Sequence, residues 1–117
     1  MYKISVIIPV FNSSLYLDHC LSTVVNQTLK DIEIILIDDG STDDSLNVIK
    51  NYAKKYNNIK YTSKENEGQA IARNIGIQMS SGEFITFIDS DDYIELNMLE
   101  KLYNIAKPDN SDIVLCD

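Results

Sequence analysis

An apolar run of the sequence, residues 84–88, stops abruptly on the aspartates Asp89, Asp91 and Asp92. The run is short, rich in aromatic and β-branched residues and preceded by a glycine, which is typical of a strand buried on both faces of a sheet. The acids therefore follow the carboxyl end of a strand. In open parallel sheets ligands bind at that edge, because the loops that leave the strands separate there. The stretch predicts an α/β fold with a binding site at these aspartates.

Carboxylates this close in the sequence repel one another, and a cation among them or solvent around them relieves the repulsion. Oxygen ligands of this kind suit Mg²⁺ or Mn²⁺, which keep several waters and share the remaining positions with substrate phosphates. We interpret Asp89 and Asp91 as metal ligands, because their spacing lets them converge from one tight turn. For Asp92 the sequence leaves two interpretations open, a metal ligand or a cap of the helix that follows.

The whole chain alternates between strand-like and helix-like patterns. Apolar runs predict strands at residues 3–9, 32–37, 59–63, 84–88 and 113–116. Between them, apolar residues at helical spacing predict helices around residues 17–25, 46–56, 71–79 and 96–106, the last ended by Pro108 and Asn110. This order is typical of a mostly parallel sheet with helices on both faces. Because the series ends on a strand, we expect the chain to be the first part of a larger domain.

The ends of these elements carry more specific expectations. Pro9 should close the first strand, because proline cannot donate to a sheet ladder. Ser13 or Ser14 should cap the first helix, and Ser41, Thr42 and Asp43 offer capping oxygens to the second. In the third helix, Ile71, Ala72, Ile75 and Met79 should face the core, and Leu96 should belong to the last helix.

A second acid cluster follows the second strand at Asp38 and Asp39. Gly40 permits a tight turn after them, and Asp43 and Asp44 fall in the first turn of the next helix, where the helix dipole favours acids. Asp38 and Asp39 precede the turn, so at least one should face the crevice. A carboxylate there could accept a hydrogen bond from a ring N–H of a base or from a ribose hydroxyl.

Composition narrows the possible partners. A chain of 117 residues with 44% hydrophobic content can bury one core. Its formal net charge of −8 argues against nucleic acid, which requires clustered Lys and Arg. Cys20 and Cys116 form no CxxC pair, so a reducing cytoplasm is the simplest location. The apolar run at residues 4–8 is too short for a signal peptide or a membrane span.

Two further features surround the predicted crevice. Asn66 and Gly68 lie in a loop where both can adopt left-handed conformations. Arg73, the only arginine in the sequence, could order a carboxylate or reach a phosphate from its helix. His19 should lie at a helix surface. Because it is the only histidine in the sequence, a metal site built from several histidines is excluded.

Several of these runs together resemble the family 2 glycosyltransferases of the GT-A fold. They occur in the family's order and cover nearly the whole chain. The runs are Ser5–Asn12 (SVIIPVFN), Ile37–Asp43 (IDDGSTD), Asn66–Gly68 (NEG) with Ala72–Gly76 (ARNIG), and Gly82–Ile85 (GEFI) leading to Asp89–Asp92 (DSDD). One DxD run occurs often by chance, whereas four runs in order, each at a predicted strand end, form a strong signal.

The resemblance implies a Rossmann-like GT-A sandwich that binds a nucleotide-diphosphate sugar, typically a UDP-sugar, and transfers the sugar with inversion to an acceptor hydroxyl. It implies that Asp39 pairs with the base, that Asp89 reaches the ribose, and that Asp91, with Asp89, holds the Mn²⁺ or Mg²⁺ that bridges the diphosphate. The implied nucleotide-binding residues are Pro9, Val10, Phe11, Asp39, Asn66, Gly68, Arg73, Asp89 and Ser90.

The resemblance also sets what to expect of the chain as a whole. Residues 1–117 correspond to the N-terminal, nucleotide-binding portion of the domain, and the carboxylate that acts as general base is expected beyond Asp117. We therefore expect this chain to bind donor without efficient transfer. Family members act on glycan, lipid or protein acceptors, as in polysaccharide and cell-envelope synthesis, and the expected location is the cytoplasm or the inner face of the membrane.

Two alternative interpretations share the fold class. A receiver-like signalling module is a doubly wound domain of about this size. It requires an acid pair after the first strand, where this chain has Pro9–Asn12, and a lysine after the fifth. A nucleotidyltransferase requires a basic, glycine-rich loop after the first strand, and Phe11–Ser14 is neither basic nor glycine-rich.

Overall fold

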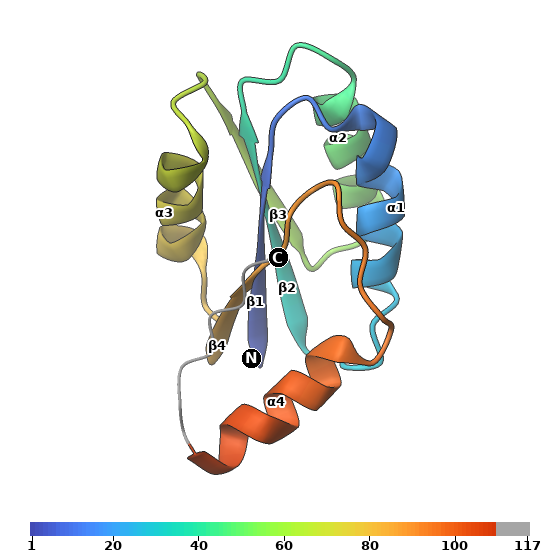
Figure 1. The fold of residues 1–117 in the computed structure, drawn as a ribbon, viewed down its shortest axis with the longest axis vertical. Coiled ribbons are helices and arrows are strands. Elements are labelled where there is room, and N and C mark those ends of the chain that lie inside the picture. Colours follow the sequence, from blue (N-terminus) through green and yellow to red (C-terminus); the bar gives the residue numbers. More distant parts are fainter. Residues whose placement is uncertain (110–117) are drawn as a thin grey trace.

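The computed structural model describes residues 1–109. These residues form a four-stranded sheet in the order β3-β2-β1-β4, and all three strand pairings are parallel (Figure 1). The strands are β1 (Ile4–Val10), β2 (Ile32–Asp39), β3 (Ile59–Lys64) and β4 (Phe84–Phe87). The predicted parallel α/β architecture is confirmed. The strand predicted at residues 113–116 and the predicted helix-terminating Asn110 lie outside the described residues.

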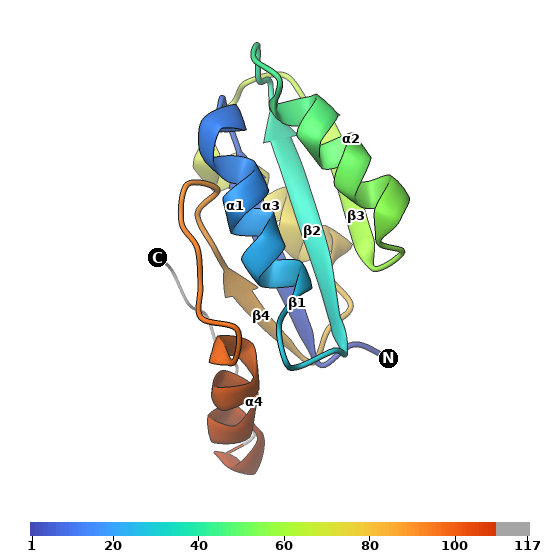
Figure 2. The same cartoon turned by 90° about the vertical axis from the view of Figure 1, so that its right-hand side faces the viewer.

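Helices cover both faces of the sheet. They are α1 (Ser14–Val25), α2 (Ser45–Lys55), α3 (Gln69–Met79) and α4 (Met98–Asp109). In Figure 1, α1 and α2 lie on one face of the sheet and α3 lies on the other. Figure 2 shows α4 beyond the end of the sheet at which β1 begins. No helix among residues 1–109 is both long enough and apolar enough to span a bilayer.

The core has two layers because successive side chains of a strand point to opposite faces. Toward α1 and α2, β1 contributes Ile4, Val6 and Ile8, all at most 2% exposed. Toward α3 it contributes Ile7, which packs in a smaller cluster with Ala72. β1 and β2 are buried at every position and are nearly continuous apolar runs, as predicted, whereas the edge strand β3 is mostly exposed.

The helix α3 lies very close to the sheet at Gly76. A β-carbon at this position would lie 2.4 Å from Cγ2 of Ile7. Glycine therefore permits a helix-to-strand distance that any other residue would obstruct.

Pro9 does not end β1, contrary to the prediction. The strand continues to Val10, and Pro9 is in register with Ile37 of β2. The carbonyl of Ile7 accepts from the backbone N–H of Ile88 on the β4 side. Alternate residues of a strand direct their backbone groups to the same side, so the nitrogen of Pro9, like the carbonyl of Ile7, faces the β4 side. β4 ends at Phe87, beside Ile7, and does not extend to Pro9. The proline therefore removes no ladder hydrogen bond.

The predicted helix caps are confirmed only in part. Ser13 is the N-cap residue of α1, as predicted, but neither its hydroxyl nor the side chain of Asp44, the N-cap residue of α2, makes a capping hydrogen bond. The Asp43 carboxylate instead accepts hydrogen bonds from the backbone N–H groups of Ser45 and Ser14, and so connects the starts of the two helices. Asp43 therefore supplies a local capping oxygen to α2, as predicted, and a long-range one to α1.

Three other local predictions also require correction. Ile71 is 41% exposed, because α3 turns Ala72 toward the sheet and leaves Ile71 at its margin. Leu96 is 52% exposed and precedes α4, which begins at Met98. The same helix includes Pro108, which therefore does not end it.

A buried carboxylate, Glu33 of β2, stabilises the end of the sheet opposite the carboxyl ends of the strands. Its side chain is fully buried on the α3 face and pairs with Lys60 of β3 at 2.9 Å. It also accepts hydrogen bonds from the Ser5 hydroxyl and from the backbone N–H and hydroxyl of Ser81. Burial acts to raise the pKa of Glu33, but the bonds from Ser5, Lys60 and Ser81 lower it to about 2.

Candidate functional site

A crevice of about 730 Å³ opens at the carboxyl ends of β1, β2 and β4. It contains every residue that the sequence predicted for the site. Its lining residues are Pro9, Val10, Phe11, Asn12, Ser13, Tyr16, Asp39, Asn66, Gly68, Gln69, Arg73, Asp89, Ser90 and Asp91. Asp39 and Asp91, which come from different strand ends, therefore face one common cavity.

On the β1 side, the crevice is lined by the apolar residues Val10 and Phe11 and then by Asn12, which is hydrogen-bonded to the loop after β2. Val10 is buried, whereas Phe11 is 50% exposed at the opening. Asn12 adopts a left-handed conformation with φ 48°. Its side-chain oxygen accepts from the backbone N–H of Thr42 at 2.8 Å, and its own N–H donates to the Ser41 hydroxyl at 3.0 Å. The loop after β1 is thus fixed to the loop after β2.

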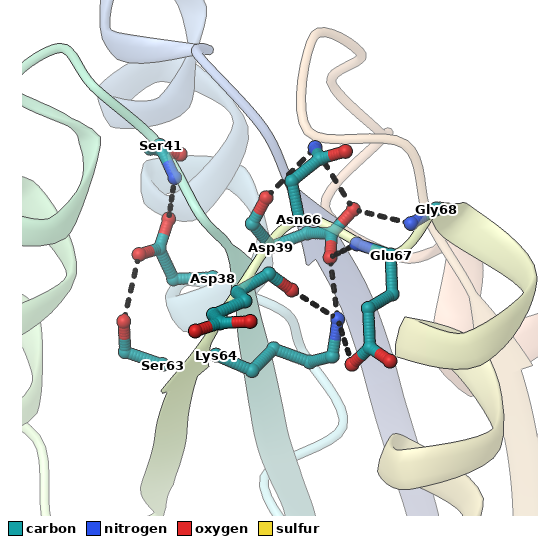
Figure 3. A network of polar contacts seen from close by, with 9 residues as sticks. Asp38, Asp39, Ser41, Ser63, Lys64, Asn66, Glu67 and Gly68 are labelled. Carbon is teal, nitrogen blue, oxygen red and sulfur yellow. Dashed lines mark hydrogen bonds and ion pairs between the residues drawn. The ribbon is translucent and has the colours of Figure 1, made fainter.

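Asp39 is the centre of the β2 side (Figure 3). Its carboxylate accepts from Nζ of Lys64 at 2.6 Å and from the backbone N–H groups of Glu67 and Gly68, each at 3.0 Å. The Asn66 side chain donates to the Asp39 carbonyl at 3.0 Å. Asp39 therefore organises the loop between β3 and α3 and exposes only 4% of its surface.

The charge on Asp39 persists despite burial. Burial acts to raise the pKa of the Asp39 carboxyl, but the Lys64 ammonium and the backbone N–H groups of Glu67 and Gly68 lower it below its usual value. Asp39 is therefore an ionised acceptor at neutral pH. The neighbouring Asp38 accepts from the Ser41 backbone and the Ser63 hydroxyl instead, and does not line the crevice. Of the two predicted acids, Asp39 is the one that faces the cavity.

Gly40 lets the chain turn sharply after Asp39. Its φ is +76°, in the left-handed region that favours glycine. A β-carbon at Gly40 would lie 2.7 Å from the backbone nitrogen of Asn66. The close approach brings the loop after β2 against the loop after β3.

The loop after β4 brings acids to the other side of the crevice. Carboxylate oxygens of Asp89, Asp91 and Asp92 lie within 4.8 Å of one another. A set made only of carboxylate oxygens matches the chemistry of a hard divalent cation. Asp92 lies well before α4, which begins at Met98, so Asp92 does not cap that helix.

Arg73 of α3 extends toward this acidic loop. Its Nη2 lies 3.9 Å from Oδ1 of Asp89, and its guanidinium lies over the ring of Phe87, 5.5 Å from the centroid. The Gln69 side chain donates to the same Asp89 oxygen at 3.4 Å. One turn of α3 therefore presents two donors to the crevice, and Gln69 is one that the sequence analysis missed.

The two sides of the crevice are joined by hydroxyl groups. The hydroxyls of Ser13 and Ser90 are hydrogen-bonded to each other, and Ser13 donates its backbone N–H to the Ser45 hydroxyl at 2.8 Å. The thiol of the buried Cys20 on α1 donates to the Asp89 carbonyl at 3.6 Å. The sequence predicts Ser13 only as a helix cap, because a serine before a helix carries no signal of a partner at Ser90.

Other lining residues also escaped prediction. Asn12 was part of the quoted motif but received no role, and Tyr16 was not assigned to the site. His19 is exposed on α1, as predicted, and stacks on Tyr93 of the acidic loop with ring centroids 4.6 Å apart. Its contact adds to the packing of that loop on α1.

Comparison with proteins of known sequence identifies relatives of this chain. It is 54% identical over 113 residues to the cholesterol galactosyltransferase of Borreliella burgdorferi, a match that covers 97% of this chain and 32% of the relative. It is 44% identical over 117 residues to the poly(ribitol-phosphate) beta-glucosyltransferase of Bacillus spizizenii, covering 97% of this chain and 18% of the relative. The chain thus spans a third or less of these relatives.

Solved structures support the same relationship. Residues 1–349 of S. aureus TarS, in complex with UDP-GlcNAc, superpose with a TM-score of 0.84 and 33% identity over 91% of this chain and 31% of that chain. The shared architecture is the GT-A fold predicted from the sequence. The profile of the family described as "Glycosyl transferase family 2" matches residues 5–117. The chain therefore belongs to glycosyl transferase family 2.

Proposed function

We propose that residues 1–117 form the N-terminal, donor-binding portion of a glycosyltransferase that transfers a sugar from a nucleotide-diphosphate sugar, a UDP-sugar, to an acceptor hydroxyl. The observation that carries the proposal is the single crevice that holds both the buried acceptor Asp39 and the acids of the β4 loop. The family membership and the UDP-GlcNAc bound to the related TarS support it.

In this proposal the β2 side of the crevice binds the nucleoside. An ionised carboxylate accepts hydrogen bonds and cannot donate them, so Asp39 suits the imide N–H of uracil. Phe11, half exposed at the opening, offers an aromatic face beside it. The loop of Asn66 and Gly68, which Asp39 already holds in place, would border the same pocket.

The acidic loop would hold a divalent cation, Mn²⁺ or Mg²⁺, through Asp91 and Asp89. The clustered carboxylate oxygens fit such an ion, and Asp92 is close enough to contribute. When bound, the ion would act as a Lewis acid on the diphosphate that leaves the sugar. Arg73 and Gln69 would hold Asp89 in orientation, and Ser90 would keep the loop attached to the β1 side.

The rest of the reaction requires groups that we expect beyond Asp117. Inversion needs a carboxylate base that removes the acceptor proton on the face opposite the leaving group. The relatives are named for different acceptors, cholesterol in one case and poly(ribitol phosphate) in another, so we propose glycoconjugate or cell-envelope synthesis without choosing among glycan, lipid and protein acceptors. The proposed location is the cytoplasm or the inner face of the membrane.

Calorimetry of UDP binding with and without Mn²⁺ tests the proposal. The wild-type chain should bind UDP more tightly with Mn²⁺, and Asp91→Asn should lose that metal-dependent gain because the oxygen ligand is neutralised. Asp31→Asn is a matched control, because this substitution makes the same charge change at an exposed residue that forms an ion pair with Lys3. Equal metal-dependent binding by the wild type and Asp91→Asn would contradict the metal role, and no UDP binding by the wild type would contradict the donor-binding role.

A further inference from the structure

The two carboxylate oxygens of Asp39 are not equivalent. Oδ1 accepts two short bonds, from Nζ of Lys64 at 2.6 Å and from the N–H of Glu67 at 3.0 Å. Oδ2 accepts one such bond, from the N–H of Gly68 at 3.0 Å, and a longer one of 3.4 Å from Asn66. The Asn66 amide makes its shorter bond, 3.0 Å, to the Asp39 carbonyl. Oδ2 is therefore the less strongly bonded oxygen, and a further donor could replace the long bond from Asn66, whose amide keeps its shorter bond to the Asp39 carbonyl.

Lys64 is the cation that compensates the buried charge of Asp39. Its side chain is 12% exposed and that of Asp39 is 6% exposed, so solvent screens the pair only weakly. The ammonium is fixed by further bonds to the Glu65 carbonyl at 2.6 Å and the Glu67 carboxylate at 3.2 Å (Figure 3). Lys64 pairs with Oδ1 of Asp39 and so leaves Oδ2 to other donors.

We propose that Lys64 determines which nucleobases the crevice accepts, because it keeps Asp39 in a form that accepts hydrogen bonds and cannot donate them. This inference rests on the proposed nucleotide-binding function and adds a specificity-determining residue that touches the carboxylate rather than the base. Bases with an imide or lactam N–H, uracil and guanine, can donate to Oδ2. Cytosine and adenine present a ring-nitrogen lone pair at the equivalent position and would be repelled.

Lys64 is the cation beside Asp39 that favours the ionised form of its carboxyl. The other charged groups around Asp39 are acids, except for the guanidinium of Arg73, which lies across the crevice beside Asp89. These surrounding groups are Asp38 on β2, Glu67 in the loop, Arg73 on α3, and Asp89 and Asp91 after β4. Without the lysine, burial and the acidic neighbours would favour the protonated carboxyl, and the backbone N–H groups of Glu67 and Gly68 would remain to oppose them. A protonated Asp39 could donate to the ring nitrogen of cytosine, and the discrimination would weaken.

The test compares UDP and CDP binding to the full chain by calorimetry at about pH 5 and about pH 8, a range in which ordinary carboxylates stay ionised. UDP and CDP carry the same diphosphate, so the ratio of their affinities isolates the base. Lys64→Met removes the charge and keeps an apolar stem, and Lys64→Arg restores the charge. Lys60→Met is the matched control, since Lys60 lies on the same strand and pairs with Glu33 at the other end of the sheet.

The wild type, Lys64→Arg and Lys60→Met should prefer UDP at both pH values. For Lys64→Met the ratio of UDP affinity to CDP affinity should fall roughly tenfold or more at the lower pH, which is the effect of about one hydrogen bond. An unchanged preference in Lys64→Met at both pH values would overturn the inference.

A second measurement does not depend on nucleotide binding. The titration of the Asp39 side-chain carboxyl, followed by ¹³C NMR in the wild type and in Lys64→Met, should move to higher pH in the variant. If the wild type binds neither nucleotide, the proposed function fails. The titration still tests whether Lys64 favours the ionised form of the Asp39 carboxyl. An identical titration in both proteins would refute the role given to Lys64.

Discussion

Replacement of the buried Glu33 by glutamine should destabilise the chain in a pH-dependent way. The carboxylate is fully buried, and its pKa is lowered from 4.5 to about 2 by bonds from Ser5, Lys60 and Ser81 that outweigh burial. The difference of about 2.5, at about 1.36 kcal/mol per pKa unit, gives about 3 kcal/mol of stability in the ionised state. Because the folded pKa is the lower one, this stability is complete above pH 4.5 and is lost as the pH falls toward 2.

Urea unfolding followed by circular dichroism measures this effect. The free energy of unfolding of wild type minus that of Glu33→Gln should be about 3 kcal/mol at about pH 7 and should shrink by about 2 kcal/mol at about pH 3. Other acids with lowered pKa values, such as Asp39 and Asp43, titrate in both proteins and cancel in the difference. Ser81→Ala removes one hydroxyl donor to Glu33 and should lose only part of the stability. A difference between wild type and Glu33→Gln that is the same at both pH values would refute the reasoning.

Three further substitutions test the packing. Gly76→Ala gains about 1 kcal/mol of helix propensity but must displace the Ile7 side chain, so we expect a net loss of about 1 kcal/mol in urea unfolding; a more stable variant would contradict the close contact. Gly40→Ala should cost about 1–3 kcal/mol and weaken UDP binding, because φ is positive and Asn66 is in the way; unchanged unfolding and affinity would argue against this. Leu99→Ala should cost about 2–5 kcal/mol, since its side chain is fully buried, and a loss below 1 kcal/mol would indicate that α4 packs loosely.

The sequence predicted the sheet and the position of the site for the same reason. Apolar runs such as the one before Asp89 mark strands buried on both faces, and parallel strands bring their carboxyl ends to one edge. Acids that follow such runs, like Asp39 and Asp91, must therefore meet. The crevice contains both.

What the sequence left unpredicted depends on partners distant in the chain. Glu33 lies among apolar residues of β2, and its neighbours in the sequence give no sign of its partners, because Ser5, Lys60 and Ser81 come from three other segments. The role of Lys64 is likewise invisible in the sequence, because its partner Asp39 is 25 residues away. Local rules likewise assigned Ser13 to a helix cap, whereas the fold supplied Ser90.

The strand order also affects how such a crevice can diverge. Because β1 lies between β2 and β4, the wall around Asp39 and the wall around Asp91 belong to separate stretches of chain that meet across β1. The contacts between the β1 side and the acidic loop include the paired hydroxyls of Ser13 and Ser90 and the bond from the Cys20 thiol to the Asp89 carbonyl, and these contacts use no carboxylate oxygen of Asp39 or Asp91. Under the proposed function, descendants of one ancestral gene could therefore exchange one donor nucleotide for another through changes near β3 while the acidic loop is inherited unaltered.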